Sequence, residues 1–118
     1  MAADGAQEWG GLRSGVIFEP TPTIYPADVD GKRAEGWMLL DVRTDEEWAQ
    51  GRIEGSVHIP MDQIIQRMDE IGEQVVCICA VGGRSERVTQ YLNQQGFEAV
   101  NLDGGVYGWH AEGRPLVG

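Results

Sequence analysis

A thiol and a cation lie close together in the segment Cys79-Ala80-Val81-Gly82-Gly83-Arg84-Ser85. The apolar run that begins at Val75 ends at Cys79, and a helical pattern follows the segment, which predicts a cysteine at the carboxyl end of a strand. Open α/β sheets bind ligands beyond this end of their strands, and the start of the next helix presents free backbone N–H groups. We therefore expect the Cys79 thiol to face an anion-binding loop.

The residue types of this segment suit a nucleophilic thiol. The thiolate is the reactive form, and helix N-termini and neighbouring cations lower thiol pKa values. Gly82 and Gly83 allow a sharp turn with inward N–H groups, while Arg84 adds a cation with forked donors. Ser85 is expected either to cap the helix or to donate to a bound anion. The alternative is that Cys79 is a small core residue beside an ordinary turn, because buried structural cysteines are common.

Composition indicates one acidic globular domain. The 118 residues are 42% hydrophobic, which suits a single domain with a core. A net charge of −10 argues against binding to nucleic acid or an anionic membrane. The two cysteines, Cys77 and Cys79, form neither a disulfide framework nor a zinc motif, and Cys77 is expected to be buried and inert. Without a secretory signal or an apolar run of roughly 18 residues, we expect a cytoplasmic protein.

Strand and helix patterns alternate along the chain. We expect residues 1–15 to be a flexible tail and residues 16–118 to form one domain. Strands are predicted at 16–18, 37–43, 55–60, 75–79 and 97–102, with helices over 25–34, 44–51, 64–71, 85–95 and from 106 onward. This alternation predicts an α/β fold, a mostly parallel sheet of four to five strands with helices on both faces.

Two helix ends carry local signals. Thr44 and Glu47 have the spacing of a capping box, in which each side chain binds the other residue's backbone N–H. Gly96 stands where a left-handed C-cap is needed, and Phe97 is placed to contact Leu92 as in a Schellman motif.

The segment Cys79–Ser85 resembles the Cys-x-x-Gly-x-Arg-Ser loop of single-domain rhodaneses. Leu40-Asp41-Val42-Arg43, the segment from Gly51 to Pro60, and Leu102-Asp103-Gly104-Gly105 resemble other signatures of that family, in the same order. The resemblance spans about residues 37–115. Four residues separate Cys79 from Arg84, whereas related phosphatases have five, so the loop is similar to that of the sulfurtransferase branch.

The resemblance implies a rhodanese, a thiosulfate sulfurtransferase-type enzyme. The Cys79 thiolate would take the outer sulfur of thiosulfate or a persulfide donor and pass it to cyanide or to a thiol acceptor, either a small molecule or a protein. Backbone N–H groups from Ala80 to Ser85 would bind the anionic sulfur, and Asp41 would hold Arg84 or the loop amides. No metal or organic cofactor is implied. The neutral side chains of Ala80 and Val81 favour a persulfide or protein donor over thiosulfate.

Other interpretations stay open at this point. The chain could be a catalytically weak sulfur-delivery or protein-interaction module that acts with a partner protein. Phosphatase or arsenate reductase chemistry is disfavoured by the loop length. Outside the loop, Arg43 is expected to pair with Glu46 or Glu47, and structural positions are expected for His58 and His110.

Overall fold

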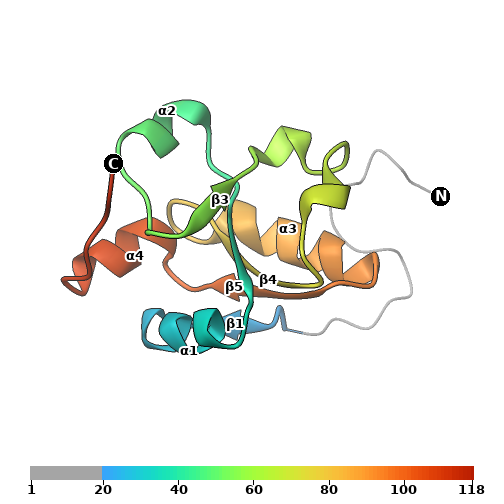
Figure 1. Cartoon of the computed structure of the whole chain (residues 1–118), viewed down its shortest axis with the longest axis horizontal. Coiled ribbons are helices and arrows are strands. Elements are labelled where there is room, and N and C mark those ends of the chain that lie inside the picture. Colours follow the sequence, from blue (N-terminus) through green and yellow to red (C-terminus); the bar gives the residue numbers. More distant parts are fainter. Residues whose placement is uncertain (1–19) are drawn as a thin grey trace.

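The computed structural model describes residues 20–118, and this part of the chain forms one parallel sheet of five strands (Figure 1). The strand order across the sheet is β1-β5-β4-β2-β3. The strands are β1 (Thr23–Ile24), β2 (Met38–Asp41), β3 (Ser56–His58), β4 (Gln74–Ile78) and β5 (Glu98–Leu102). The predicted α/β fold with a parallel sheet is therefore confirmed.

Helices cover both faces of this sheet, as predicted. The α-helices are α1 (Val29–Ala34), α2 (Asp45–Ala49), α3 (Gly83–Gln94) and α4 (Gly105–Ala111), and single 3-10 turns occur at η2 (Pro26–Asp28), η3 (Met61–Gln63) and η4 (Met68–Glu70). In Figure 1, α3 lies on one side of the sheet and α1 on the other. Within residues 20–118, no helix has both the length and the hydropathy needed to cross a membrane.

The alternation of side chains along each strand divides the core into two layers. One layer packs Leu40, Val75 and Cys77 against the buried face of α3. The other packs the intervening strand residues, Leu39 and Val76 among them, against α1 and α4. Neighbouring residues of a strand point to opposite faces, so a strand buried on both sides must be apolar throughout. The apolar run that ends at Cys79 is continuous because β4 is buried on both of its faces.

Both predicted helix ends are present. Glu47 N–H donates to Thr44 Oγ1 (3.2 Å) and Thr44 N–H donates to Glu47 Oε1 (3.0 Å), which completes the capping box. Gly96 has φ +96°, and Phe97 N–H donates to Leu92 O (3.0 Å) across the end of α3. These hydrogen bonds satisfy backbone groups that a helix end leaves unpaired.

The segments that connect the main elements differ in part from the prediction. The helix expected over 64–71 is wrong, because the chain forms only turns and the short η4 there. Ile64 and Ile71 are buried in the core while Ile65 is 41% exposed. The predicted tail and the strand at 16–18 lie outside the described residues. A further strand, β1, was not predicted; it lies at the edge of the sheet within the proline-rich segment, a position in which strands tolerate proline.

Candidate active site

The candidate loop begins one residue after β4 and ends in the first turn of α3. Gly82 precedes the helix in the left-handed region, with φ +107°, a conformation that glycine adopts without steric cost. This turn directs the Gly82 N–H at the Cys79 sulfur, with an N–Sγ distance of 3.0 Å. The predicted juxtaposition of a strand-end thiol and inward N–H groups is therefore present.

Helix α4 holds the outer side of this loop. Val106 N–H donates to Cys79 O (2.8 Å), and Tyr107 N–H donates to Ala80 O (2.9 Å). Gly105 makes this approach possible, since a Cβ at its position would lie 2.2 Å from Cys79 O. With its carbonyl groups turned toward α4, the loop is free to turn its N–H groups toward the thiol.

A buried polar network lies beneath the thiol. The Ser85 hydroxyl is 3.3 Å from Cys79 Sγ and 2.5 Å from Asn101 Oδ1. Asn101 Nδ2 donates to Gly82 O (3.1 Å), which fixes the orientation of the amide. Since Ser85 has one hydroxyl hydrogen, Asn101 and Cys79 compete for it. Ser85 thus contacts the sulfur from inside α3 rather than capping the helix.

Competing effects act on the pKa of the Cys79 thiol. Burial, the largest of them, would raise this pKa. Hydrogen bonds from the Ser85 hydroxyl and from the backbone N–H groups of Ser85, Gly82 and Val81 together outweigh burial, so the pKa lies below that of an ordinary thiol. A lower pKa increases the fraction of thiolate near neutral pH.

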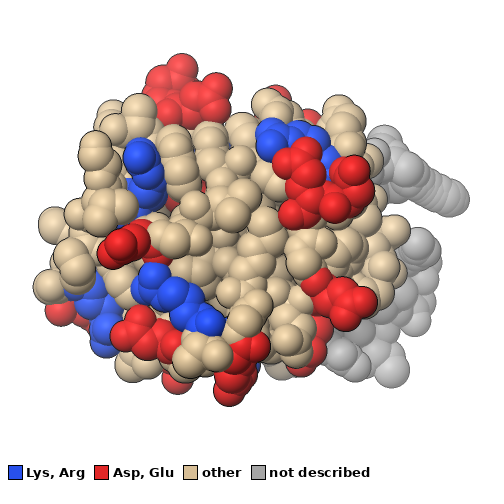
Figure 2. All heavy atoms as spheres, in the orientation of Figure 1, with Lys and Arg blue, Asp and Glu red and all other residues tan. Residues whose placement is uncertain are grey.

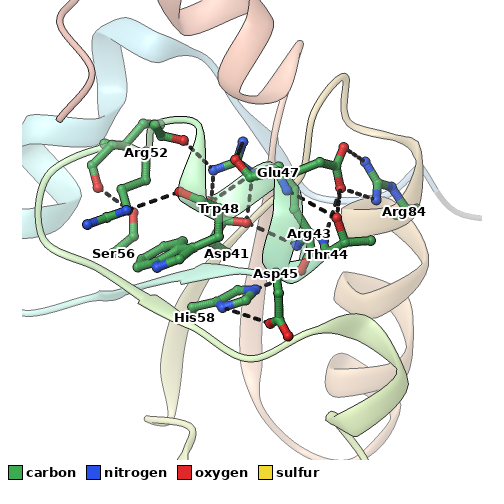
Figure 3. A network of polar contacts seen from close by, with 12 residues as sticks. Asp41, Arg43, Thr44, Asp45, Glu47, Trp48, Arg52, Ser56, His58 and Arg84 are labelled. Atoms are coloured by element: carbon green, nitrogen blue, oxygen red, sulfur yellow. Dashed lines mark hydrogen bonds and ion pairs between the residues drawn. The ribbon is translucent and has the colours of Figure 1, made fainter. Parts of the chain in front are cut away.

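Arg84 is bound mainly by an acidic residue: hydrogen bonds to Glu47 are the largest cause of its raised pKa, and a smaller contribution comes from the Cys79 sulfur. Arg84 Nη1 and Nη2 donate to Glu47 Oε1 (2.8 Å) and Oε2 (2.9 Å), as Figure 3 shows. This bidentate ion pair joins α3 to α2. The sequence predicted the cap that Glu47 makes to its own helix but not this second contact.

Asp41 does not hold Arg84 or the loop amides, which corrects the expectation. It is fully buried and binds the guanidinium of Arg43 through both oxygens, with an Arg43 Nη2 to Oδ2 distance of 2.8 Å (Figure 3). Arg43 also donates to the backbone carbonyls of Glu47 and Gly51, so the predicted side-chain pairing of Arg43 with Glu46 or Glu47 is wrong. Asp41 pairs with Arg43 because both side chains are buried, and a buried carboxylate is stable only beside a cation that is buried with it.

The remaining residues of the loop differ in how far they are exposed to solvent. Ala80 is buried, Gly83 opens α3 at the surface, and Val81 is 64% exposed at the rim of the loop. Away from the loop, His58 stacks on Trp48 at 4.7 Å between ring centroids.

Sequence reasoning missed Asn101 as a site residue. It is a polar residue in the otherwise mostly apolar strand β5, two residues before the turn into α4, and that exception is the signal that could have identified it.

Comparisons with known proteins show which family this chain resembles. The family model for the rhodanese-like domain matches residues 26–112. A Bacillus subtilis protein named "Putative sulfurtransferase YtwF" is 44% identical over 83 residues, which is 69% of this chain and 81% of the relative. A protein of Allochromatium vinosum named "Sulfurtransferase" is 43% identical over 86 residues, 70% of this chain and 80% of the relative.

Solved structures show the same fold. A crystal structure of a rhodanese-related protein from Thermoplasma volcanium has a TM-score of 0.75 and 31% identity, over 81% of this chain and 97% of that protein. A rhodanese-like domain protein from Staphylococcus aureus has a TM-score of 0.71 and 35% identity, over 82% of this chain and 99% of that protein. The chain therefore belongs to the rhodanese-like domain family.

Proposed function

We propose that the protein is a sulfurtransferase that carries sulfane sulfur as a persulfide on Cys79. The observation that carries this proposal is the environment of the thiol, whose sulfur accepts the Gly82 N–H at 3.0 Å at the carboxyl edge of the sheet. The lowered pKa of Cys79 supports a nucleophilic thiolate. Relatives named as sulfurtransferases support the same reaction class.

The reaction runs in two displacements. The Cys79 thiolate attacks the outer sulfur of a persulfide or of thiosulfate; an S–S bond forms on Cys79 while the donor S–S bond breaks, and a thiolate or sulfite leaves with the bonding pair. A cyanide or thiolate acceptor then attacks the outer sulfur of the Cys79 persulfide and restores the thiolate. In both steps, charge on sulfur faces the N–H of Gly82 and the hydroxyl of Ser85.

Mass spectrometry of the intact protein tests this proposal. After incubation with thiosulfate or with an alkyl persulfide, we expect the mass to increase by about 32 Da, one sulfur atom, as a covalent intermediate requires. A Cys79→Ser variant should show no increase, and a Cys77→Ser variant should retain it. Absence of the added mass with every sulfane donor would sink the proposal.

A second candidate, sulfur delivery to a partner protein, is favoured by apolar exposure beside the loop. Val81 is 64% exposed, and Tyr107, whose N–H binds the loop, is 63% exposed. A delivery module should turn over slowly with cyanide alone. A turnover number near the enzyme median of about 10 s⁻¹ with cyanide would exclude it.

A further inference from the structure

Glu47 neutralises the single cation of the loop. Between Cys79 and Ser85 the sequence has one basic residue, Arg84, and both of its terminal nitrogens donate to the Glu47 carboxylate at 2.8 and 2.9 Å. The planar guanidinium matches the two carboxylate oxygens, so this is the strongest geometry such a pair can adopt. About a third of each side chain is exposed, which places the pair at the surface.

The carboxylate is held in the charged form. Thr44 N–H and Thr44 Oγ1 both donate to Glu47 Oε1, at 3.0 and 3.2 Å, in addition to Arg84 Nη1. The bonds from Arg84 are the largest cause of a Glu47 pKa of about 2. Glu47 therefore keeps its negative charge at every pH at which a thiolate reacts, and the pair has no net charge.

Apart from Arg84, the side chains of the loop offer a dianion no charge. Ala80 and Val81 are neutral, Arg43 is buried against Asp41, and the next arginine, Arg87, lies about one turn further along α3. On the face drawn in Figure 2, the Lys and Arg side chains of the described residues lie in small groups next to Asp and Glu. The whole chain carries a net charge of −10, which repels anions at long range.

We propose that Glu47 is a specificity-determining residue that makes the Cys79 site favour persulfide donors of low charge over dianions such as thiosulfate. The inference rests on the proposed function of Cys79. An alkyl persulfide brings at most one negative charge and releases a thiol or thiolate, whereas thiosulfate brings two and releases sulfite. The backbone N–H groups of the loop can bind either sulfur donor. The preference between thiosulfate and a persulfide therefore depends on the net charge at the rim of the loop.

A purely orienting role for Glu47 predicts the opposite result. If Glu47 served only to aim Arg84 at an anion, removing its charge would loosen Arg84 and weaken thiosulfate binding. If Glu47 neutralises Arg84, removing its charge leaves a free cation beside Cys79 and strengthens thiosulfate binding. The sign of the change separates the two roles.

The test compares donors in a Glu47→Gln variant. Gln keeps the capping-box geometry with Thr44, because glutamine serves this position as glutamate does. Rates of Cys79 persulfide formation are measured by mass spectrometry with thiosulfate and with an alkyl persulfide that has no other charged group. We expect the ratio of the two second-order rate constants to move about tenfold toward thiosulfate at low salt, and less at 1 M salt where charges are screened.

Two matched variants isolate the charge of Glu47. Glu46→Gln removes the same charge from the neighbouring, exposed position of α2, for which no hydrogen bond or ion pair with Arg84 is present among the described residues. Its donor ratio should stay within about twofold of the native value. Glu47→Asp keeps the charge and should keep the native preference.

An unchanged ratio in Glu47→Gln, or a shift away from thiosulfate, overturns the inference. A shift of equal size in Glu46→Gln also overturns it, since any acidic residue would then serve. If no donor produces a Cys79 persulfide in the native protein, the proposed function fails instead, so the two failures are distinguishable.

Discussion

Two thiols, Cys77 and Cys79, lie two residues apart on the same face of the sheet and belong to the same core layer. Burial raises the pKa of Cys77 to about 12, whereas the pKa of Cys79 lies below the ordinary value. Both experience desolvation. The difference is that Cys79 lies beyond the last ladder residue, Ile78, where the chain turns and its N–H groups are free to donate to sulfur.

The comparison shows that position along the strand decides thiol acidity here. Within a strand, backbone N–H groups bind the neighbouring strand and none is left for a side chain. At the strand end, the turn at Gly82 and the first turn of α3 supply N–H groups and a hydroxyl. An anion is stabilised only where donors are not already engaged.

The largest effect is expected from moving the donors away from Cys79. Gly105→Ala places a Cβ within 2.2 Å of Cys79 O, so α4 and the loop must separate. We expect persulfide formation to slow about 100-fold, since a displacement near 1 Å disrupts reactive geometry. The rate is measured with an alkyl persulfide. Gly113→Ala, at φ +83° with no atom within 4 Å, is the control for backbone strain alone; equal losses in both variants would contradict this account.

Removing one hydrogen-bond donor from the Cys79 sulfur should raise the pKa of Cys79 toward that of Cys77. In Ser85→Ala the hydroxyl beside the sulfur is lost, so the pKa of Cys79 rises and the rate near pH 7 falls about tenfold, as expected when a charged group loses a hydrogen bond of roughly 1.5 kcal/mol. The pH dependence of the reaction with iodoacetamide reports the pKa. Thr89→Val removes the hydroxyl that acts on Cys77 and should leave this profile in place. An unshifted profile in Ser85→Ala would show that the N–H groups suffice.

The two thiols should affect stability with opposite sign as pH changes. Cys79 has a lowered folded pKa, so its contribution to stability is present above the unfolded pKa and is lost as pH falls through the folded pKa. Cys77, with a pKa raised to about 12, stays protonated while the unfolded thiol ionises near its ordinary value of 9.0, so it reduces stability as pH rises above that value.

Urea unfolding measures this difference. Between roughly pH 9 and 11, the free energy of unfolding of Cys77→Ala should decline less steeply than that of the native protein, by up to about 1.4 kcal/mol per pH unit. Parallel curves would mean that Cys77 ionises freely in the folded state.

The smallest effect on reactivity is expected from Cys77 itself. Cys77→Ala removes a buried sulfur from the layer beneath α3 and should cost about 1 kcal/mol of stability, near the centre of the distribution for point mutations. Persulfide formation on Cys79 should change by less than about twofold, because the groups that donate to the Cys79 sulfur come from Gly82 and Ser85 and not from Cys77. A large loss of rate in a folded Cys77→Ala protein would assign that thiol a part in the reaction.

Local signals made much of the fold predictable. Continuous apolar runs indicated strands buried on both faces; β2 and β5 lie within the predicted ranges, and β4 begins and ends one residue before its predicted range. The Thr44 capping box and the Gly96 cap were also predictable, because each depends on residues close in sequence. The loop around Cys79 was predictable for the same reason, because the residues that form its turn and begin the next helix are close in sequence.

Long-range pairing accounts for what the sequence did not reveal. Arg84 had several acidic residues as candidate partners, and only the packing of α2 beside α3 brings Glu47 to it. Asp41 and Arg43 bind each other because the strand end buries both, which no spacing rule states. Asn101 contacts Ser85 across 16 positions of the chain, a distance at which pattern alone carries no information.

The hydrogen bonds from α4 to the carbonyls of Cys79 and Ala80 also have a consequence for biosynthesis. The loop is complete only when residues 105–107 reach it, and they come 26 to 28 positions after Cys79 in the order of translation. A nascent chain therefore lacks these two hydrogen bonds to the loop until α4 has left the ribosome. The loop takes its final form only after most of the domain has been made.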